Sequence, residues 1–201
     1  MFNSELVNYV VVTGWLNEYK AREYDHTGML HHASLVDKSS ALGLVTDGLF
    51  EKIKGLVVYE ELEEAALVLE QFKRLGSRSI DSLERGEVWV KCSWVYLALK
   101  KWVEAEKAMH TAVIEYPPAS HQQAVAFWLL GEVQWQFTGG YPASFENFSR
   151  AIEGFEHLRL LAMYDHQPAR AQWYAQKMDL LKVSLRERVA KGFFDSAVSL
   201  P

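Results

Sequence analysis

The stretch that decides the fold is residues 86–119, GEVWVKCSWVYLALKKWVEAEKAMHTAVIEYPPA. Apolar and small residues recur in it at spacings of three and four, as they do along one face of an α-helix. Pro117-Pro118 closes the stretch, because proline cannot continue a helix. The pattern predicts two helices, residues 82–100 and 103–116, joined by a short turn.

The same stretch resembles the tetratricopeptide repeat, a helix-turn-helix of about 34 residues with the pattern W-x2-L-G-x2-Y, then A-x3-F, then P. The matching positions are Trp89, Cys92-Ser93, Tyr96, Ala105, Met109, Ala112 and Pro117. A small residue such as Ala105 lets the two helices of a hairpin approach closely, while Trp89 and Tyr96 fill the space between successive hairpins.

Two weaker copies flank this repeat. The copy that follows has Phe127, Leu130-Gly131 and Gln134 in its first helix and, after one extra residue in the turn, Ser144, Phe148 and Ala151 in its second. The copy that precedes has Phe50, Ile53 and Val57, followed by Ala66. Ala66, Ala105 and Ser144 recur at intervals of 39 residues, as a stacked array predicts. The resemblance implies a right-handed superhelical array of about three hairpins, and a generic helical bundle is the alternative.

The whole chain is expected to be all-α. We divide it into an N-terminal helical segment (1–46), the tetratricopeptide-like hairpins (47–164) and a C-terminal capping helix and tail (165–201). The predicted helices are 4–24, 48–59, 62–75, 82–100, 103–116, 121–137, 143–164 and 168–191, with residues 138–142 as a turn.

Composition narrows the class of protein. Hydrophobic residues make up 49% and charged residues 23% of the 201 residues, which is typical of a folded domain. The net charge is −5 and basic residues are scattered, which disfavours nucleic-acid binding. A single cysteine, Cys92, excludes an intramolecular disulfide, and the apolar run 9–12 is too short to span a membrane. We expect a cytoplasmic protein without nucleic-acid or membrane partners.

The resemblance also implies where a protein or peptide partner would bind. In tetratricopeptide arrays the first helix of each hairpin lines a concave groove. The matching positions, our predicted partner-binding residues, are Val90, Trp94, Leu97, Trp128, Glu132 and Trp135. Family members that clamp a terminal carboxylate place Lys and Asn there, so large apolar side chains argue against such a clamp. They favour an amphipathic helix or an apolar extended segment.

The surface could instead be covered by the chain itself. The last predicted helix carries its own apolar stripe, formed by Ala171, Tyr174, Met178 and Leu181. Terminal capping helices are common in helical arrays. Both interpretations of the surface stay open from the sequence alone.

No motif indicates an enzyme, a cofactor or a metal centre. The sequence has no HExxH, P-loop, GxGxxG or GxSxG motif. A small helical metalloprotein using His26, His31 and His32 is one alternative, although their spacing does not place His26 and His31 on one helical face. Cys92 as a nucleophile is another, but it occupies a packing position of the repeat. The remaining alternatives are a sensor for an apolar ligand or signalling peptide, and a homo-oligomer.

Overall fold

The computed structural model describes residues 41–139 and 141–198, with side chains for residues 45–139 and 141–190. The predicted helix over residues 4–24 and the histidine cluster at residues 26–32 therefore lie outside the described residues. The chain divides into two compact units, Met1–Gly48 and Leu49–Pro201, and the packing described below is that of the second unit.

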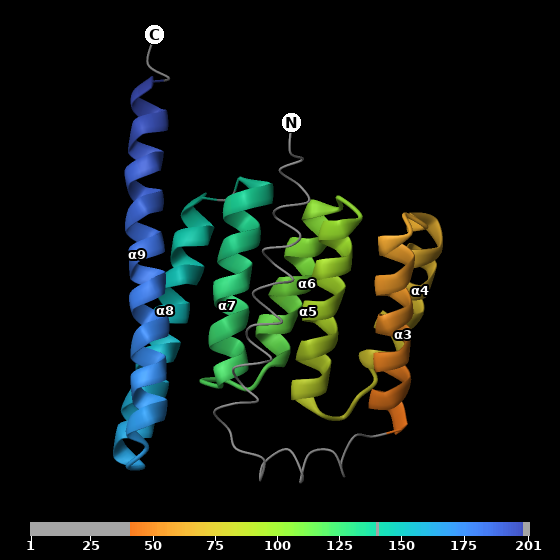
Figure 1. Cartoon of the computed structure of the whole chain (residues 1–201), viewed down its shortest axis with the longest axis horizontal. Coiled ribbons are helices and arrows are strands. Elements are labelled where there is room, and N and C mark those ends of the chain that lie inside the picture. Colours follow the sequence, from red (N-terminus) through yellow and green to blue (C-terminus); the bar gives the residue numbers. More distant parts are fainter. Residues whose placement is uncertain (1–40, 140, 199–201) are drawn as a thin grey trace. The chain divides into compact units, whose positions relative to one another are not determined.

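The described residues form seven α-helices and one π-helical turn, and they contain no strand (Figure 1). In chain order, the elements are α3 (Ala41–Val58), α4 (Leu62–Gly76), α5 (Ser82–Ala98), α6 (Trp102–Glu115), α7 (His121–Val133), η1 (Gln134–Thr138), α8 (Tyr141–Tyr164) and α9 (Pro168–Val198). Successive helices are antiparallel, and from α4 onward each packs against the next along the chain. The all-helical class predicted from the sequence is confirmed.

Helix starts agree with the prediction where a capping side chain marks them. The Asp81 carboxylate accepts a hydrogen bond from the Leu83 amide at 2.8 Å, and the Ser120 hydroxyl accepts one from the Gln123 amide at 3.1 Å. Three helices extend beyond their predicted bounds, since α3 begins at Ala41, α8 begins at Tyr141 and α9 continues to Val198. In contrast, α5 ends at Ala98 and α6 at Glu115, before their predicted ends. Proline is tolerated in the first turn of a helix, where its missing N–H has no partner to lose. This explains why Pro142 does not delay α8.

A residue in the left-handed conformation lies in each turn between the paired helices. These residues are Glu60 (φ 62°), Lys100 (φ 58°) and Gly139 (φ 68°). The third turn also contains η1, a π-helical turn directly after α7. A π-helical turn widens the helix by one residue relative to an α-helix. It therefore accommodates the extra residue that the second copy of the repeat pattern has in this turn.

The second helix of each pair buries the same stripe of positions. In α6 it comprises Ala105, Ala108, Met109 and Ala112, in α8 Ser144, Asn147, Phe148 and Ala151, and in α4 Ala65, Val68, Leu69 and Phe72. The first member is fully buried in every stripe. In α4 that member is Ala65, whereas the predicted Ala66 is partly exposed. The prediction was wrong by one residue because Ala65, and not Ala66, shares a face with Val68, Leu69 and Phe72.

Small residues bring the paired helices into close contact. The Ser93 hydroxyl on α5 donates to the Ala105 carbonyl oxygen on α6 at 2.9 Å, and both residues are fully buried. On α7, a Cβ added to Gly131 would lie 2.8 Å from a ring carbon of Phe148 on α8. Ser93 and Gly131 are the small positions of the repeat pattern, so the structure supports the physical reason given for them.

The interior consists of three hydrophobic clusters that follow one another along the chain. The first joins α3, α4 and α5 with one residue of α6, the second joins α5, α6 and α7, and the third joins α7, α8 and α9. Phe50 and Phe72 meet in the first cluster with ring centroids 5.8 Å apart. Partly buried aromatic side chains such as Trp94 and Phe127 contact two clusters each.

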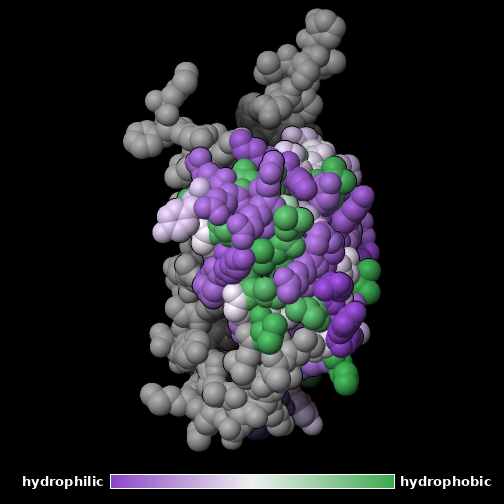
Figure 2. All heavy atoms as spheres, turned by 90° about the vertical axis from the view of Figure 1, so that its right-hand side faces the viewer, coloured by the Kyte–Doolittle hydropathy of each residue, from purple (hydrophilic) through white to green (hydrophobic). Residues whose placement is uncertain are grey.

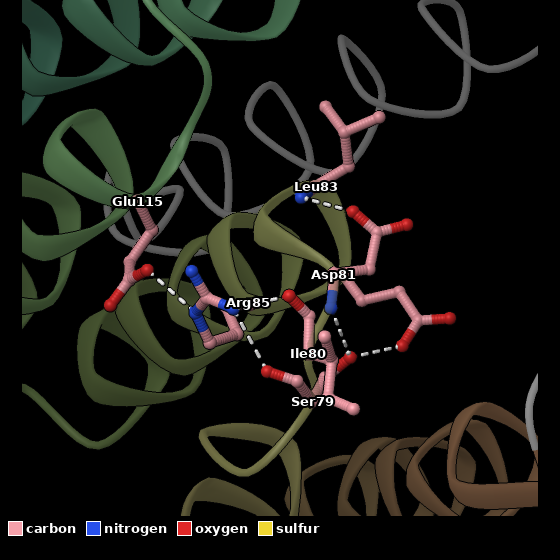
Figure 3. A network of polar contacts seen from close by, with 7 residues as sticks. Ser79, Ile80, Asp81, Leu83, Arg85 and Glu115 are labelled. Carbon is pink, nitrogen blue, oxygen red and sulfur yellow. Dashed lines mark hydrogen bonds and ion pairs between the residues drawn. The ribbon is translucent and has the colours of Figure 1, made fainter.

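A network of hydrogen bonds and an ion pair connects the loop between α4 and α5 with the end of α6 (Figure 3). One nitrogen of Arg85, Nη1, donates to the carbonyl oxygens of Ser79 at 2.9 Å and Ile80 at 2.8 Å. The Nε atom of Arg85 donates to the Glu115 carboxylate at 2.7 Å. Arg85 thus links two consecutive helical pairs outside the apolar core.

Candidate partner-binding surface

The predicted partner-binding residues of α5 are largely part of the protein interior. Val90 is buried against Met109 and Leu130, between α5, α6 and α7. Trp94 is partly buried, and its ring centroid lies 6.3 Å from that of Phe50 on α3. Leu97 is partly exposed. Of the three, Val90 packs the core, and a role in partner binding stays a prediction for Trp94 and Leu97.

The predicted residues of α7 and η1 come together around one buried carboxylate. Glu132 is only 6% exposed, and it accepts hydrogen bonds from Trp128 Nε1 at 3.2 Å and Gln136 Nε2 at 3.0 Å. Its remaining partner comes from α9, where Arg188 Nη2 lies 2.8 Å and 2.7 Å from the two carboxylate oxygens. A buried charge of this kind is stable only when it is paired and hydrogen-bonded.

The Arg188 guanidinium is also held between aromatic rings. Its central carbon lies 4.7 Å from the ring centroid of Phe148 and 5.5 Å from that of Trp135. Arginine at these distances gains from the negative face of an aromatic ring. Glu132, Trp135 and Phe148 therefore form a pocket around Arg188, which we call the Arg188 pocket.

A second cation of α9, Lys177, lies over the side chain of Trp128 on α7. Lys177 Nζ lies 6.0 Å from the ring centroid of Trp128 and 5.2 Å from that of Trp173. Ala171, Tyr174, Met178 and Leu181 form the α9 stripe expected from the sequence, and all four are buried in the third cluster. The last helix packs on α8, and its side chains reach Trp128 and Glu132 of α7, which is compatible with the capping interpretation of this surface.

Sequence reasoning did not single out Arg188. It lies seven residues after Leu181, two turns further along the same face of α9, and is itself partly buried. An arginine within an apolar helical stripe is the signal that could have identified it.

His121, at the first position of α7, is enclosed by aromatic side chains. Its ring centroid lies 5.2 Å from that of Trp173, 5.9 Å from Tyr174 and 6.0 Å from Phe155. Burial, together with the positive charges of Arg170 and Lys177, lowers the pKa of His121 to about 4. The imidazole is therefore neutral near pH 7 and packs as an aromatic side chain.

Cys92 does not have the environment of a nucleophile. The side chain is fully buried in the first cluster, and burial raises the pKa of its thiol to about 12. Reactive cysteines have lowered pKa values and accessible sulfur atoms. Among the described residues, no group of His, Cys, Asp and Glu side chains could hold a metal ion. The His26, His31 and His32 cluster is not part of that region.

Two further surface features lie away from α7. An open groove of about 760 Å³ runs between α8 and α9, and its lining mixes apolar side chains such as Leu160 with charged ones such as Glu156 and Lys182. On the face formed by α3 and α4, apolar side chains gather in the middle, with charged side chains around them (Figure 2). Leu62 and Leu67, which are both exposed, lie on α4.

Over the region that the structure describes, no helix is both long enough and apolar enough to cross a membrane. Comparison of the chain with protein-family models, curated proteins and solved structures found no match. By its structure, the chain is an all-helical protein whose helices pack in sequential, antiparallel pairs.

Proposed function

We propose that this chain is a non-enzymatic interaction module built as a tetratricopeptide-like, right-handed array, and that it binds an α-helical segment of a partner protein. The repeat positions support this architecture, because the buried stripes of α4, α6 and α8 share one spacing and small residues lie at the hairpin contacts. The partner binds along α5, α7 and η1, at the exposed parts of Leu97, Trp128 and Trp135.

The observation that carries the proposal is the seating of α9 on this surface. Trp128, Glu132 and Trp135, which the repeat pattern selects as partner-binding positions, all contact side chains of one amphipathic helix. A surface that accepts a helix of its own chain has the shape and the chemistry to accept a helix of another chain.

The end of α9 leaves room for exchange with a partner helix. Between Lys182 and Ala190 no residue of α9 is buried, whereas four residues from Ala171 to Leu181 are. The attachment of the later turns therefore depends mainly on Leu185 and Arg188, which are partly buried. A partner helix can replace these turns while the earlier part of α9 stays in the core.

The test is a capture experiment from native lysate with the full chain and a Leu97→Ala/Trp135→Ala variant. The matched control is Leu160→Ala/Tyr164→Ala, which changes exposed residues of α8 away from this surface. Circular dichroism must first show equal helicity in all three proteins. We expect one partner, identified by mass spectrometry, to bind wild type and the control but not the first variant. Equal capture by all three proteins, or capture by none, would contradict the proposal.

A further inference from the structure

We infer that the Arg188 pocket is a recognition site for an arginine side chain, filled here by the chain's own α9, and that the partner helix carries an arginine that takes the place of Arg188. This inference deepens the proposed function and rests on it. It specifies the chemistry of the partner: an amphipathic helix with an arginine within its apolar stripe.

The pocket contains a buried carboxylate, which makes its occupant specific. Glu132 is buried, so removing Arg188 without a substitute leaves a carboxylate with hydrogen bonds only from Trp128 and Gln136. An uncompensated buried charge is strongly unfavourable. Arg188 supplies the positive charge that compensates this carboxylate in the folded chain.

The aromatic walls select a guanidinium over an ammonium group. Arg188 lies between the rings of Phe148 and Trp135 while its Nη2 atom bridges both oxygens of Glu132. A planar guanidinium can stack on a ring and donate hydrogen bonds in its own plane at once, whereas a lysine ammonium is a compact and strongly hydrated charge. Arginine is therefore the side chain that this arrangement fits.

The aromatic walls of the pocket are packed against α7 and α8. The Trp135 ring centroid lies 4.7 Å from that of Tyr141 and 5.7 Å from that of Phe145, both on α8. Phe148 is 2% exposed and packs on Gly131 of α7. The side chains that line the pocket thus come from α7, η1 and α8, and α9 contributes the guanidinium that fills it as well as apolar side chains of the cluster that contains Phe148.

Arg188, which fills the pocket in this structure, leaves one of its hydrogen-bond donors unsatisfied. Arg188 Nη1 is buried and has no hydrogen-bond acceptor among the described residues. Leaving a buried donor unsatisfied is unfavourable. This cost lowers the free energy that Arg188 gains in the pocket and so favours its exchange.

The test uses the full chain with Arg188→Ala and the ethylguanidinium ion, which reproduces the end of an arginine side chain. Ethylguanidinium should raise the melting temperature of this variant by about 3 °C at tenfold excess over its dissociation constant. Ethylammonium at the same concentration should not. Wild type, with its pocket filled, and Arg188→Ala/Glu132→Gln, without the carboxylate, should show no rise.

An equal rise in melting temperature in all three proteins, or no rise in Arg188→Ala, would contradict the proposal that the pocket binds an arginine side chain. If Arg188→Ala does not fold alone, its refolding is followed with ethylguanidinium or ethylammonium present: we expect ethylguanidinium alone to restore helicity, and restoration by both ions or by neither would contradict the pocket.

The capture experiment then separates the pocket from the proposed function. If wild type retains a partner, Arg188→Ala should retain more of it and Arg188→Ala/Glu132→Gln less, and equal retention would overturn partner recognition by this pocket. If nothing is captured but ethylguanidinium binds Arg188→Ala selectively, the pocket stands and the proposed function fails.

Discussion

At the scale of single residues, His121 ties the stability of the chain to pH. Burial first, and then the charges of Arg170 and Lys177, lower its pKa to about 4 in the folded protein, against about 6.5 in an unfolded chain. Between these pH values the unfolded chain binds a proton at this residue that the folded chain does not bind. The free energy of unfolding therefore falls as the pH falls through this window, and this contribution is complete above about pH 6.5.

We predict that this effect disappears in His121→Gln. Between pH 6.5 and pH 5.0, wild type should lose up to about 1.5 kcal/mol more unfolding free energy than the variant. Urea unfolding at the two pH values measures the difference, and the other titrating groups cancel because both proteins contain them. Equal losses in the two proteins would show that His121 takes up its proton without opposition in the folded state.

The candidate site residues came from the resemblance to the tetratricopeptide repeat. Trp128, Glu132 and Trp135 were selected together because they match the first-helix positions that line the groove in that family, and their role in partner binding stays a prediction. Arg188 was not selected, since it lies 56 residues from Glu132 and a charged residue near the end of a helix is normally solvated. Its role depends on where α9 lies against α7, which helical periodicity does not specify.

At the scale of elements, the closeness of α7 and α8 depends on one missing side chain. A methyl group on Gly131 would lie 2.8 Å from the ring of Phe148, which is buried and cannot move aside. Gly55 on α3 is the matched control, because a Cβ there meets no atom within 4 Å. The two glycines are both inside helices and differ in their surroundings.

We predict opposite effects of alanine at these positions. Gly131→Ala should lower the unfolding free energy by about 1 to 2 kcal/mol, because overpacking outweighs the gain in helix propensity. Gly55→Ala should raise it by roughly 0.5 to 1 kcal/mol, because only the gain in propensity applies. Chemical denaturation of both variants measures the contrast. Two changes of the same sign would mean that the contact between α7 and α8 adapts to a larger residue.

The helical class of the elements followed from local sequence signals, whereas some helix boundaries did not. Asp81 and Ser120 cap α5 and α7 at the positions that the sequence predicts, because capping is a contact within a few residues. The extra residue after α7 was visible from the repeat pattern, but its π-helical form was not. Gln134 in this turn is buried and hydrogen-bonded to Glu106 on α6 and Asn147 on α8. The π-helical turn is thus bound to two other helices. A local sequence pattern cannot predict such contacts.

At the scale of the whole molecule, the Leu49–Pro201 unit is organised as a row of clusters rather than around one centre. The first and third clusters share no residue, and the second cluster joins them through partly buried aromatic side chains. In arrays of this kind, each pair of helices is stabilised mainly by its neighbours. A loss of packing in one cluster should therefore be felt mostly near that cluster.

Phe72 and Phe155 offer a reciprocal test of this organisation. Both are 0% exposed, Phe72 in the first cluster and Phe155 in the third. Replacing either by leucine removes part of a buried ring at a cost of roughly 1 to 2 kcal/mol. Phe72→Leu should speed amide hydrogen exchange in α4 and leave α8 and α9 almost unchanged, and Phe155→Leu should do the reverse. If each variant speeds exchange evenly along all the helices, the unit opens as one cooperative body, because local opening would confine the change to the damaged cluster.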